Sequence, residues 1–301
     1  MTMKVVLLTP RGPGLTSVSS RIIDALKRRG VTVMKLHPGH VPIDINNANP
    51  DFVAKYFSEG GVRGGIVRGV GTHKIKKVYH RLGVFDLFEE AGVYLMNSRR
   101  CLELATNKAL TSYLLVKNGI PTPRTILCEG IKRASKAFEA LGRDVVIKPL
   151  FGSKGIGVMR LFDEGLASNV FYNLDRLDEV FYLQEYVEHS NYDIRAMVLG
   201  GQVLCAMKRI SSPEAANPWK TNVAIGASGE GIELPEDLKE LAIKSAEAVG
   251  GEFIGVDIAE TPAGPTIIEV NSVPGFNELQ KTTEIDIALA MVDYFLGQLK
   301  R

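Results

Sequence analysis

The chain has 301 residues, of which 45% are hydrophobic and 23% charged, as is typical of a soluble globular protein with about two domains. The formal charge of +2, without any Lys/Arg run, excludes a basic arm and gives no reason to expect nucleic-acid binding. Three widely spaced cysteines match neither a disulfide framework nor a CxxC metal site, so a reducing, cytoplasmic location is expected. No apolar run has the length of a signal-peptide core or of a membrane span, so no membrane partner is expected.

Residues 1–100 alternate between strand and helix patterns. The expected elements are a strand at 3–10, a helix at 17–30, strands at 31–36 and 64–70, a helix at 73–92 and a strand at 93–97. Because strand, helix and strand follow one another, these patterns predict a parallel, doubly wound sheet. Residues 1–100 are therefore predicted to form an open α/β domain.

Mixed patterns follow, and they predict two α+β lobes behind the first domain, at 101–187 and 188–301. The first lobe is expected to contain helices at 101–119 and 131–141, strands at 121–129, 144–150, 157–162 and 181–187, and a helix before the last strand. The second is expected to contain a hairpin at 193–210, a helix at 235–250, strands at 253–260 and 265–271, and a closing helix at 284–299.

A glycine-rich turn follows one strand of the first lobe. Lys148 lies on that strand, and Gly152, Gly155 and Gly157 come next. Glycines let backbone amides approach an anion, and a lysine supplies positive charge for a phosphate. The lysine precedes the glycines, so the stretch is not a Walker A loop. A phosphate site and a hairpin turn with a solvated lysine both remain open on these residues alone.

The stretch "YLQEYVEHSNYDIRAMV" has two features that are informative at strand spacing. Glu185 and Val187 share a face, and a strand that leaves its sheet here could offer backbone groups to an adenine. Asp193 and Arg195 place opposite charges on one face of the next strand. The alternative for this second pair is an ion pair on a solvated face, which contributes little to stability.

The most informative stretch is "FIGVDIAETPAGPTIIEVN". Asp257 lies in an apolar strand, and Glu269 and Asn271 end the next strand on one face. If the two strands form a hairpin, three oxygen-bearing side chains converge. Buried carboxylates without a partner are costly, and Mg²⁺ prefers such oxygen ligands while keeping positions for substrate phosphates. A divalent-cation site is therefore predicted.

Taken in order, these stretches resemble the ATP-grasp superfamily and, within it, the RimK-like α-L-glutamate ligases, including the tetrahydromethanopterin:α-L-glutamate ligase type. The resemblance covers about residues 97–295 and rests on "NK" (107–108), "VVIKPLFGSKGIGV", "LQEYV", "DIRAMVLGGQVLCAMKR", "KTN", "GVDIAE" and "IIEVNSVPGFNELQKTTEIDIA". It implies an ATP-grasp fold, with a pre-ATP-grasp α/β domain at 1–100 and two lobes, 101–187 and 188–301, that enclose ATP.

The resemblance also implies roles for individual residues. The residues implied to bind ATP are Lys108, Lys148, Gly152, Ser153, Gly155, Gly157, the hinge Gln184, Glu185, Tyr186 and Val187, and Asp193. Those implied to contact substrate or the γ-phosphate during catalysis are Arg195, Arg209, Lys220 and Asn222. Those implied to hold Mg²⁺ or Mn²⁺, as two ions, are Asp257, Glu269 and Asn271.

The implied reaction is ATP-dependent ligation of L-glutamate to an acceptor carboxylate through an acyl phosphate. Two departures concern the acceptor: residues 209–222 are about three residues longer than in the enzymes that modify ribosomal proteins, and residues 224–227 replace the expected "HRGG". A cofactor tail, of tetrahydromethanopterin or a deazaflavin coenzyme, is therefore preferred as the acceptor. The alternatives are a ribosomal-protein C-terminus, a ligase for another amino acid and a non-catalytic ATP-binding subunit. The resemblance also suggests a homo-oligomer.

Three further stretches have residue types that could line the active site. The turn at 11–17 opens a helix and is a natural place to touch an anion. The cluster of Arg63, Arg68 and residues 74–77 could attract an anionic acceptor, but an ordinary basic face is the preferred interpretation. Trp219, the only tryptophan, either covers the active site or packs within its own loop.

Overall fold

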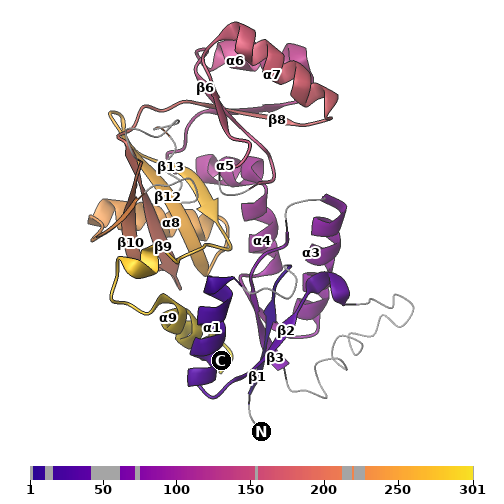
Figure 1. Cartoon of the computed structure of the whole chain (residues 1–301), viewed down its shortest axis with the longest axis vertical. Helices are drawn as coiled ribbons and strands as arrows, with labels where there is room; N and C mark the ends of the chain where they lie inside the picture. Colours follow the sequence, from indigo (N-terminus) through magenta and orange to yellow (C-terminus); the bar gives the residue numbers. More distant parts are fainter. Residues whose placement is uncertain are drawn as a thin grey trace.

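The computed structural model describes residues 3–10, 16–41, 62–71, 75–152, 155–211, 219 and 228–300. These residues form three β-sheets with helices packed on their faces, arranged along the long axis of the molecule (Figure 1). Each sheet lies within one of the three ranges expected from the sequence, whereas the domain boundaries themselves stay a prediction. Among the described helices, none is long and apolar enough to cross a lipid bilayer.

The first sheet is parallel throughout, as predicted, with strand order β2-β1-β3-β4. Alternate residues of β1 face two cores: Val5 and Leu7 pack with α1 and α9, and Val6 and Leu8 pack with α3. Both faces are therefore covered, as is usual for a parallel sheet. The elements are β1 (Lys4–Leu8), α1 (Ser17–Arg28), β2 (Thr32–Leu36), η1 (Pro38–His40), β3 (Val62–Val67), α3 (Ile75–Glu90), β4 (Tyr94–Met96) and α9 (Ile287–Gln298).

The second sheet forms the separate lobe at the top of Figure 1 and has strand order β5-β8-β6-β7. Two helices cover one face, where Phe138, Phe171 and Phe181 pack edge to face in the core. The other face is directed toward the rest of the molecule. The elements are β5 (Thr125–Cys128), α6 (Ile131–Ala140), β6 (Val145–Lys148), β7 (Met159–Leu161), α7 (Glu164–Arg176) and β8 (Phe181–Glu185).

The third sheet is antiparallel, with order β11-β10-β9-β12-β13 and α8 on one face. The predicted hairpin is confirmed: Gly200 and Gly201 turn with φ of 58° and 79°, which only glycine adopts readily. Strand β11 was not expected from the sequence. The elements are β9 (Tyr192–Leu199), β10 (Gln202–Ile210), β11 (Ser228–Ile232), α8 (Glu236–Ala248), β12 (Phe253–Thr261), β13 (Gly264–Asn271) and η3 (Leu279–Lys281).

The single helix predicted at 101–119 is wrong, because the chain forms α4 (Arg99–Thr106) and α5 (Lys108–Lys117). Asn107 separates them with an extended backbone, and its side-chain oxygen accepts hydrogen bonds from the N–H groups of Ala109 and Leu110 at 3.0 and 3.3 Å. Asparagine is a favoured N-cap because it satisfies these otherwise unpaired donors. The break matters for the site, since it places Lys108 in the first turn of a helix that lies beside the second sheet.

Candidate active site

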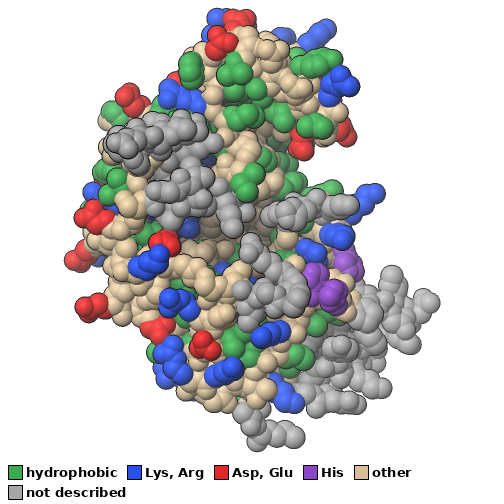
Figure 2. All heavy atoms as spheres, in the orientation of Figure 1, with side chains coloured by type: hydrophobic (Ala, Val, Ile, Leu, Met, Phe, Trp, Pro, Cys, Tyr) green, Lys and Arg blue, Asp and Glu red, His purple; other side chains and the backbone are tan. Residues whose placement is uncertain are grey.

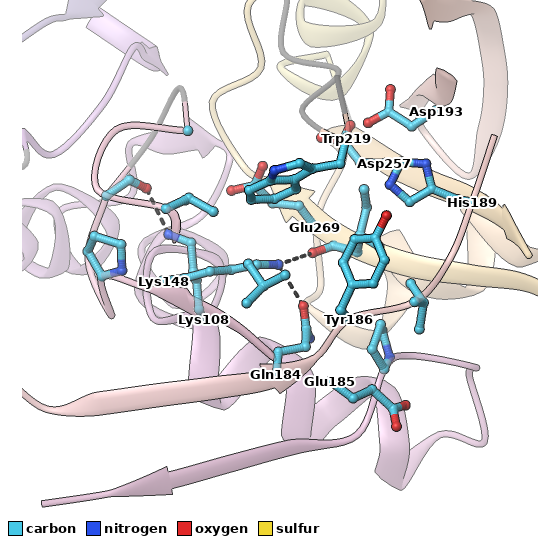
Figure 3. Close-up of a pocket in the computed structure, with 18 of the residues that line it drawn as sticks. Lys108, Lys148, Gln184, Glu185, Tyr186, His189, Asp193, Trp219, Asp257 and Glu269 are labelled. Atoms are coloured by element: carbon cyan, nitrogen blue, oxygen red, sulfur yellow. Dashed lines mark hydrogen bonds between the residues drawn. The ribbon is translucent and has the colours of Figure 1, made fainter. Parts of the chain in front are cut away.

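A cleft lies between the second and third sheets. In the orientation of Figure 1, the outline of the molecule is indented between the lobe that carries α6 and α7 and the remainder (Figure 2). β6, β8 and the glycine-rich turn form one wall of the cleft, and β12 and β13 form the opposite wall (Figure 3). The side chains singled out by the sequence therefore meet between two lobes.

Lys148, at the end of β6, is held from both walls. Its Nζ donates to Oε1 of Gln184 at 2.6 Å and to the carbonyl of Ile268 at 3.4 Å (Figure 3). An ammonium has three donors, so one remains for a ligand in the cleft. Burial lowers the pKa of Lys148 to about 8, while Glu269 raises it and Lys108 lowers it further. The alternative of a hairpin turn with a solvated lysine is confirmed in one part, because β6 and β7 form a hairpin around the glycine-rich turn. It is wrong in the other part, because Lys148 is hydrogen-bonded within the cleft and is not solvated.

Lys108 enters the same cleft from α5. Its Nζ donates to the carbonyl of Gly152 at 2.9 Å, which ties the glycine-rich turn to the helix. Burial lowers the pKa of Lys108, and Glu269 opposes this change. Gly155 and Gly157 continue the turn with φ of 69° and 76°, a backbone region that favours glycine. Two lysines and a glycine turn thus form a positively charged wall, which suits phosphate groups.

The titration of Lys148 gives a testable pH dependence. Because its pKa is about 8 in the nucleotide-free protein, Lys148 loses its charge as pH rises through that value. We expect the affinity for Mg·ATP to fall between about pH 7 and about pH 9, since the neutral amine no longer attracts phosphate. Equilibrium titrations across this range test the point. Lys148→Met should bind more weakly with a flatter profile, and equally steep profiles in both proteins would contradict this role.

Residues 184–187 were expected to bind adenine, but the side chains of Gln184 and Glu185 bind other parts of the protein. Gln184 turns its side chain inward, where Nε2 donates to Thr125 Oγ1 at 3.0 Å while Oε1 receives Lys148, so this side chain positions the phosphate lysine. Glu185 points away from the cleft and accepts a hydrogen bond from the backbone N–H of Arg124 at 2.7 Å (Figure 3). In the described chain, the backbone N–H of Val187 has no hydrogen-bond partner and is available to a ligand.

Aromatic groups line the end of the cleft next to this hinge. The Tyr186 ring packs edge to face with Trp219, with centroids 6.3 Å apart, and under the guanidinium of Arg160, whose Cζ lies 3.4 Å from the ring centroid. Arg160 is held in turn by both oxygens of Asp144, at 2.8 and 2.6 Å. Trp219 thus lines the cleft, which agrees with the interpretation that it covers the active site. These π-faces suit a flat heterocycle.

Four charged side chains form a buried cluster on β9, β10 and β12. Arg195 donates from Nε and Nη2 to both oxygens of Asp257, the second at 2.8 Å. Arg209 also donates to Asp257, at 2.8 Å, and pairs with both oxygens of Asp193. Asp193 thus pairs across the strands with Arg209, and Arg195 pairs with Asp257. The side chains of Asp193 and Arg195 are only 1% and 11% exposed, so the alternative of an ion pair on a solvated face is wrong.

The pKa values of two members of this cluster, Asp257 and Arg209, are shifted in the direction that keeps each side chain charged. Burial works to raise the pKa of Asp257, but Arg195 and Arg209 outweigh it and hold that pKa below its ordinary value. Burial likewise opposes the charge of Arg209, whose pKa is nevertheless raised by Asp257 and Asp193. Asp257 and Arg209 are therefore both held in their charged forms by their ion-pair partners.

The predicted cation site is built on β13, directly opposite Asp257. Asp257 and Glu269 are paired in register across β12 and β13. Within the described part of the chain, the carboxylate of Glu269 makes no hydrogen bond or ion pair, and Nδ2 of Asn271 is buried without a partner. The unpaired carboxylate of Glu269 fits a hard cation, and Asn271 could add its Oδ1, whereas its buried Nδ2 is a donor and is not a ligand. Asp257 is different, because both of its oxygens are already engaged by arginines.

No group of three His, Cys, Asp or Glu side chains suited to a metal occurs in the described ranges. A cation bound by Glu269 and Asn271 would therefore depend on further oxygens, as is usual for Mg²⁺ with substrate phosphates. Three residues predicted to act here, Ser153, Lys220 and Asn222, lie outside the described residues.

Two supporting residues were missed by the sequence interpretation. Gln184 was assigned to the hinge and not to the support of Lys148, and Arg160 was not considered. The available signal for Arg160 was a single arginine in an otherwise apolar strand, next to a strand preceded by Asp144.

A cleft between two lobes, with lysines and a glycine turn facing a carboxylate, defines a nucleotide-dependent ligase of the ATP-grasp class. The fold agrees: the crystal structure of a RimK domain ATP-grasp protein from Sphaerobacter thermophilus has a TM-score of 0.75, at 20% identity, over 98% of this chain and 100% of that chain. Residues 105–295 match the RimK-like ATP-grasp domain, and the chain belongs to that family. The predictions of fold, family and an ATP-dependent ligase are therefore confirmed.

Two relatives extend the comparison. The chain is 33% identical over 257 residues to the tetrahydromethanopterin:alpha-L-glutamate ligase of Methanosarcina acetivorans, which covers 76% of this chain and 78% of that protein. It is 29% identical over 294 residues to a probable alpha-L-glutamate ligase of Maridesulfovibrio salexigens, which covers 97% and 95% of the two chains. The second match includes the first α/β domain as well as both lobes.

Proposed function

We propose that this ligase joins the amine of L-glutamate to a carboxylate of an acceptor and converts ATP to ADP and phosphate. The observation that carries the proposal is the arrangement of Lys108 and Lys148 on one wall of the cleft, facing the unpaired Glu269 on the other. Such a pair of walls suits a triphosphate and a divalent cation. The names of the relatives, which are α-L-glutamate ligases, support glutamate as the amine substrate.

The reaction proceeds through an acyl phosphate. An oxygen of the acceptor carboxylate attacks the γ-phosphorus and ADP leaves. The glutamate nitrogen then attacks the acyl carbon, loses a proton, and phosphate leaves with one oxygen of the former carboxylate. Mg²⁺ or Mn²⁺ on Glu269 and Asn271 would supply positive charge to the phosphoryl oxygens.

The described side chains position the reactants and stabilise charge, which is most of what phosphoryl transfer requires from a protein. Lys148, oriented by Gln184, and Lys108, at the start of α5, offer donors to phosphate oxygens. Arg195 and Arg209 border the nucleotide cleft on the side of the acceptor, where they are held in place by their aspartate partners.

The acceptor is proposed to be the tail of a coenzyme, with tetrahydromethanopterin as the first candidate. A second, larger cleft of about 940 Å³ adjoins the nucleotide cleft and shares Lys108, Gly152, Arg209 and Glu269 with it. This cleft extends to the first sheet and leaves ample space for a cofactor. The name of the relative from Methanosarcina acetivorans supports the same acceptor class.

The proposal is tested with ATP, Mg²⁺ and L-glutamate and three acceptors: tetrahydromethanopterin, a deazaflavin coenzyme and a ribosomal-protein C-terminal peptide. Mass spectrometry is expected to detect the gain of one glutamate residue on the pterin, together with stoichiometric phosphate release. A gain on the peptide alone would replace the proposed acceptor. Tight binding of Mg·ATP without any product would reject these three acceptors, and the absence of turnover on any acceptor would favour a regulatory subunit.

Location and assembly stay proposals. The three cysteines are free thiols in the structure, which supports a reducing compartment and hence the cytoplasm. A homo-oligomer remains a prediction from the family resemblance.

A further inference from the structure

Arg68, just after β3, is a half-buried arginine without a carboxylate partner in the described chain. Its Nη2 donates to the carbonyl of Pro274 at 3.1 Å, whereas its Nε is buried without any hydrogen-bond partner. No carboxylate pairs with it in the described chain, and burial lowers its pKa to about 10. A guanidinium with a buried, unpaired N–H and no carboxylate partner is completed when an anion binds. Arg68 lines the larger cleft, where the acceptor is proposed to bind.

The first turn of α1 opens into the same cleft. Thr16 caps the helix, with its Oγ1 accepting the N–H of Ser19 at 3.1 Å. The N–H groups of Ser17 and Val18 have no partner among the described residues, and both residues line the cleft. The α1 helix has 12 residues, so the positive end of its dipole adds to these free donors.

The charges on this wall have one sign. Besides Arg68, the described residues that the first domain contributes to the cleft include Lys77 and Arg81 and no Asp or Glu. Arg81 donates to the carbonyl of Val70 at 2.6 Å, which holds it under the loop that follows Arg68. Glu278, which lies after β13 and also lines the larger cleft, is paired with Lys281 at 2.7 Å. The wall therefore attracts anions.

Building on the proposed function, we propose that Arg68 and the first turn of α1 bind an anionic group of the acceptor other than the carboxylate that is activated. The acceptor then has at least two anionic groups: a carboxylate that reacts near Glu269, and a carboxylate or phosphate that anchors it at Arg68. Pro274, whose carbonyl accepts the hydrogen bond from Arg68, lies three residues after Asn271 in the sequence. Anchoring at Arg68 therefore sets the position of the acceptor relative to the end of β13.

Steady-state kinetics of Arg68→Gln test this subsite. We expect the KM for the acceptor to rise about tenfold to hundredfold, since a charge-assisted contact is lost, while the KM values for ATP and L-glutamate stay unchanged. Arg63→Gln is the matched control, because Arg63 is an exposed arginine at the other end of the same strand. Arg68→Lys keeps the charge and should fall between wild type and Arg68→Gln. A rise in the KM for L-glutamate instead would overturn the assignment to the acceptor.

Equilibrium binding of small anions tests the subsite independently of catalysis. Glutarate and inorganic phosphate are titrated against protein saturated with Mg²⁺ and a non-hydrolysable ATP analogue. At least one of them should bind wild type and Arg63→Gln at least tenfold more tightly than Arg68→Gln, and the preferred probe identifies the anchor as carboxylate or phosphate. Equal binding to Arg68→Gln, or no binding to wild type, would overturn the subsite. Selective binding combined with a silent acceptor panel would reject the proposed acceptors and leave the subsite in place.

Discussion

Replacing Glu269 with glutamine is expected to lower the rate of ligation by about 10³-fold, because a charge that serves phosphoryl transfer is worth several kcal/mol. The same change is expected to leave stability almost unaltered. In the described chain the side chain of Glu269 makes no hydrogen bond or ion pair that holds the fold, and its charge acts on Lys108 and Lys148 without direct contact. The combination separates a functional carboxylate from a structural one.

Paired measurements of kcat and of urea unfolding on Glu269→Gln test this expectation. Glu260→Gln is the control on the partner strand, where the exposed carboxylate accepts a hydrogen bond from Tyr192 at 2.7 Å, and it should retain full activity. A Glu269→Gln protein that is active, or one that loses both activity and several kcal/mol of stability, would refute the assignment.

Asp257→Asn, unlike Glu269→Gln, is expected to destabilise the protein. We expect a loss of about 3–5 kcal/mol in the free energy of unfolding. Asp257 is 2% exposed and is bound by the guanidinium groups of Arg195 and Arg209. Removing its charge leaves two arginines in the interior with one remaining carboxylate, Asp193. Urea denaturation at neutral pH measures the loss, and a change below about 1 kcal/mol would contradict it.

The same variant gives a pH signature. The pKa of Asp257 is depressed in the folded protein, so its contribution to stability is present above the unfolded pKa and is lost as pH falls through the folded value. Wild type should therefore lose stability in acid more steeply than Asp257→Asn. Asp293→Asn is the control, because Asp293 pairs with Arg29 on the surface and should cost less than about 1 kcal/mol.

Much of the fold follows from local patterns in the sequence. The parallel first sheet, the hairpin at Gly200–Gly201 and the pairing of β12 with β13 all rest on periodicity and turn residues, and the structure confirms them. The helix break at Asn107 was missed because helical periodicity continues across it, although the capping preference of asparagine was a usable signal. Strand β11, "SGEGI", was missed because its glycines give little strand propensity.

The site shows where sequence patterns stop being informative. Alternation placed Glu269 and Asn271 on one face, and in the structure both line the larger cleft, while Glu269 also lines the nucleotide cleft. Alternation could not show that Asp257 is bound by Arg195 and Arg209, since that depends on which strands become neighbours. Arg68 appeared as part of an ordinary basic face, because burial of its Nε depends on the loop after β13.

The most direct test of the central claim is an isotope-transfer measurement on the acceptor that gains glutamate. The acceptor carboxylate is labelled with ¹⁸O in both oxygens, and the phosphate released during ligation is examined by ³¹P NMR. The acyl-phosphate route predicts that each phosphate carries one ¹⁸O atom, with the other retained in the new amide. Phosphate without the label would contradict activation of the acceptor by phosphorylation, and with it the proposed function of the cleft.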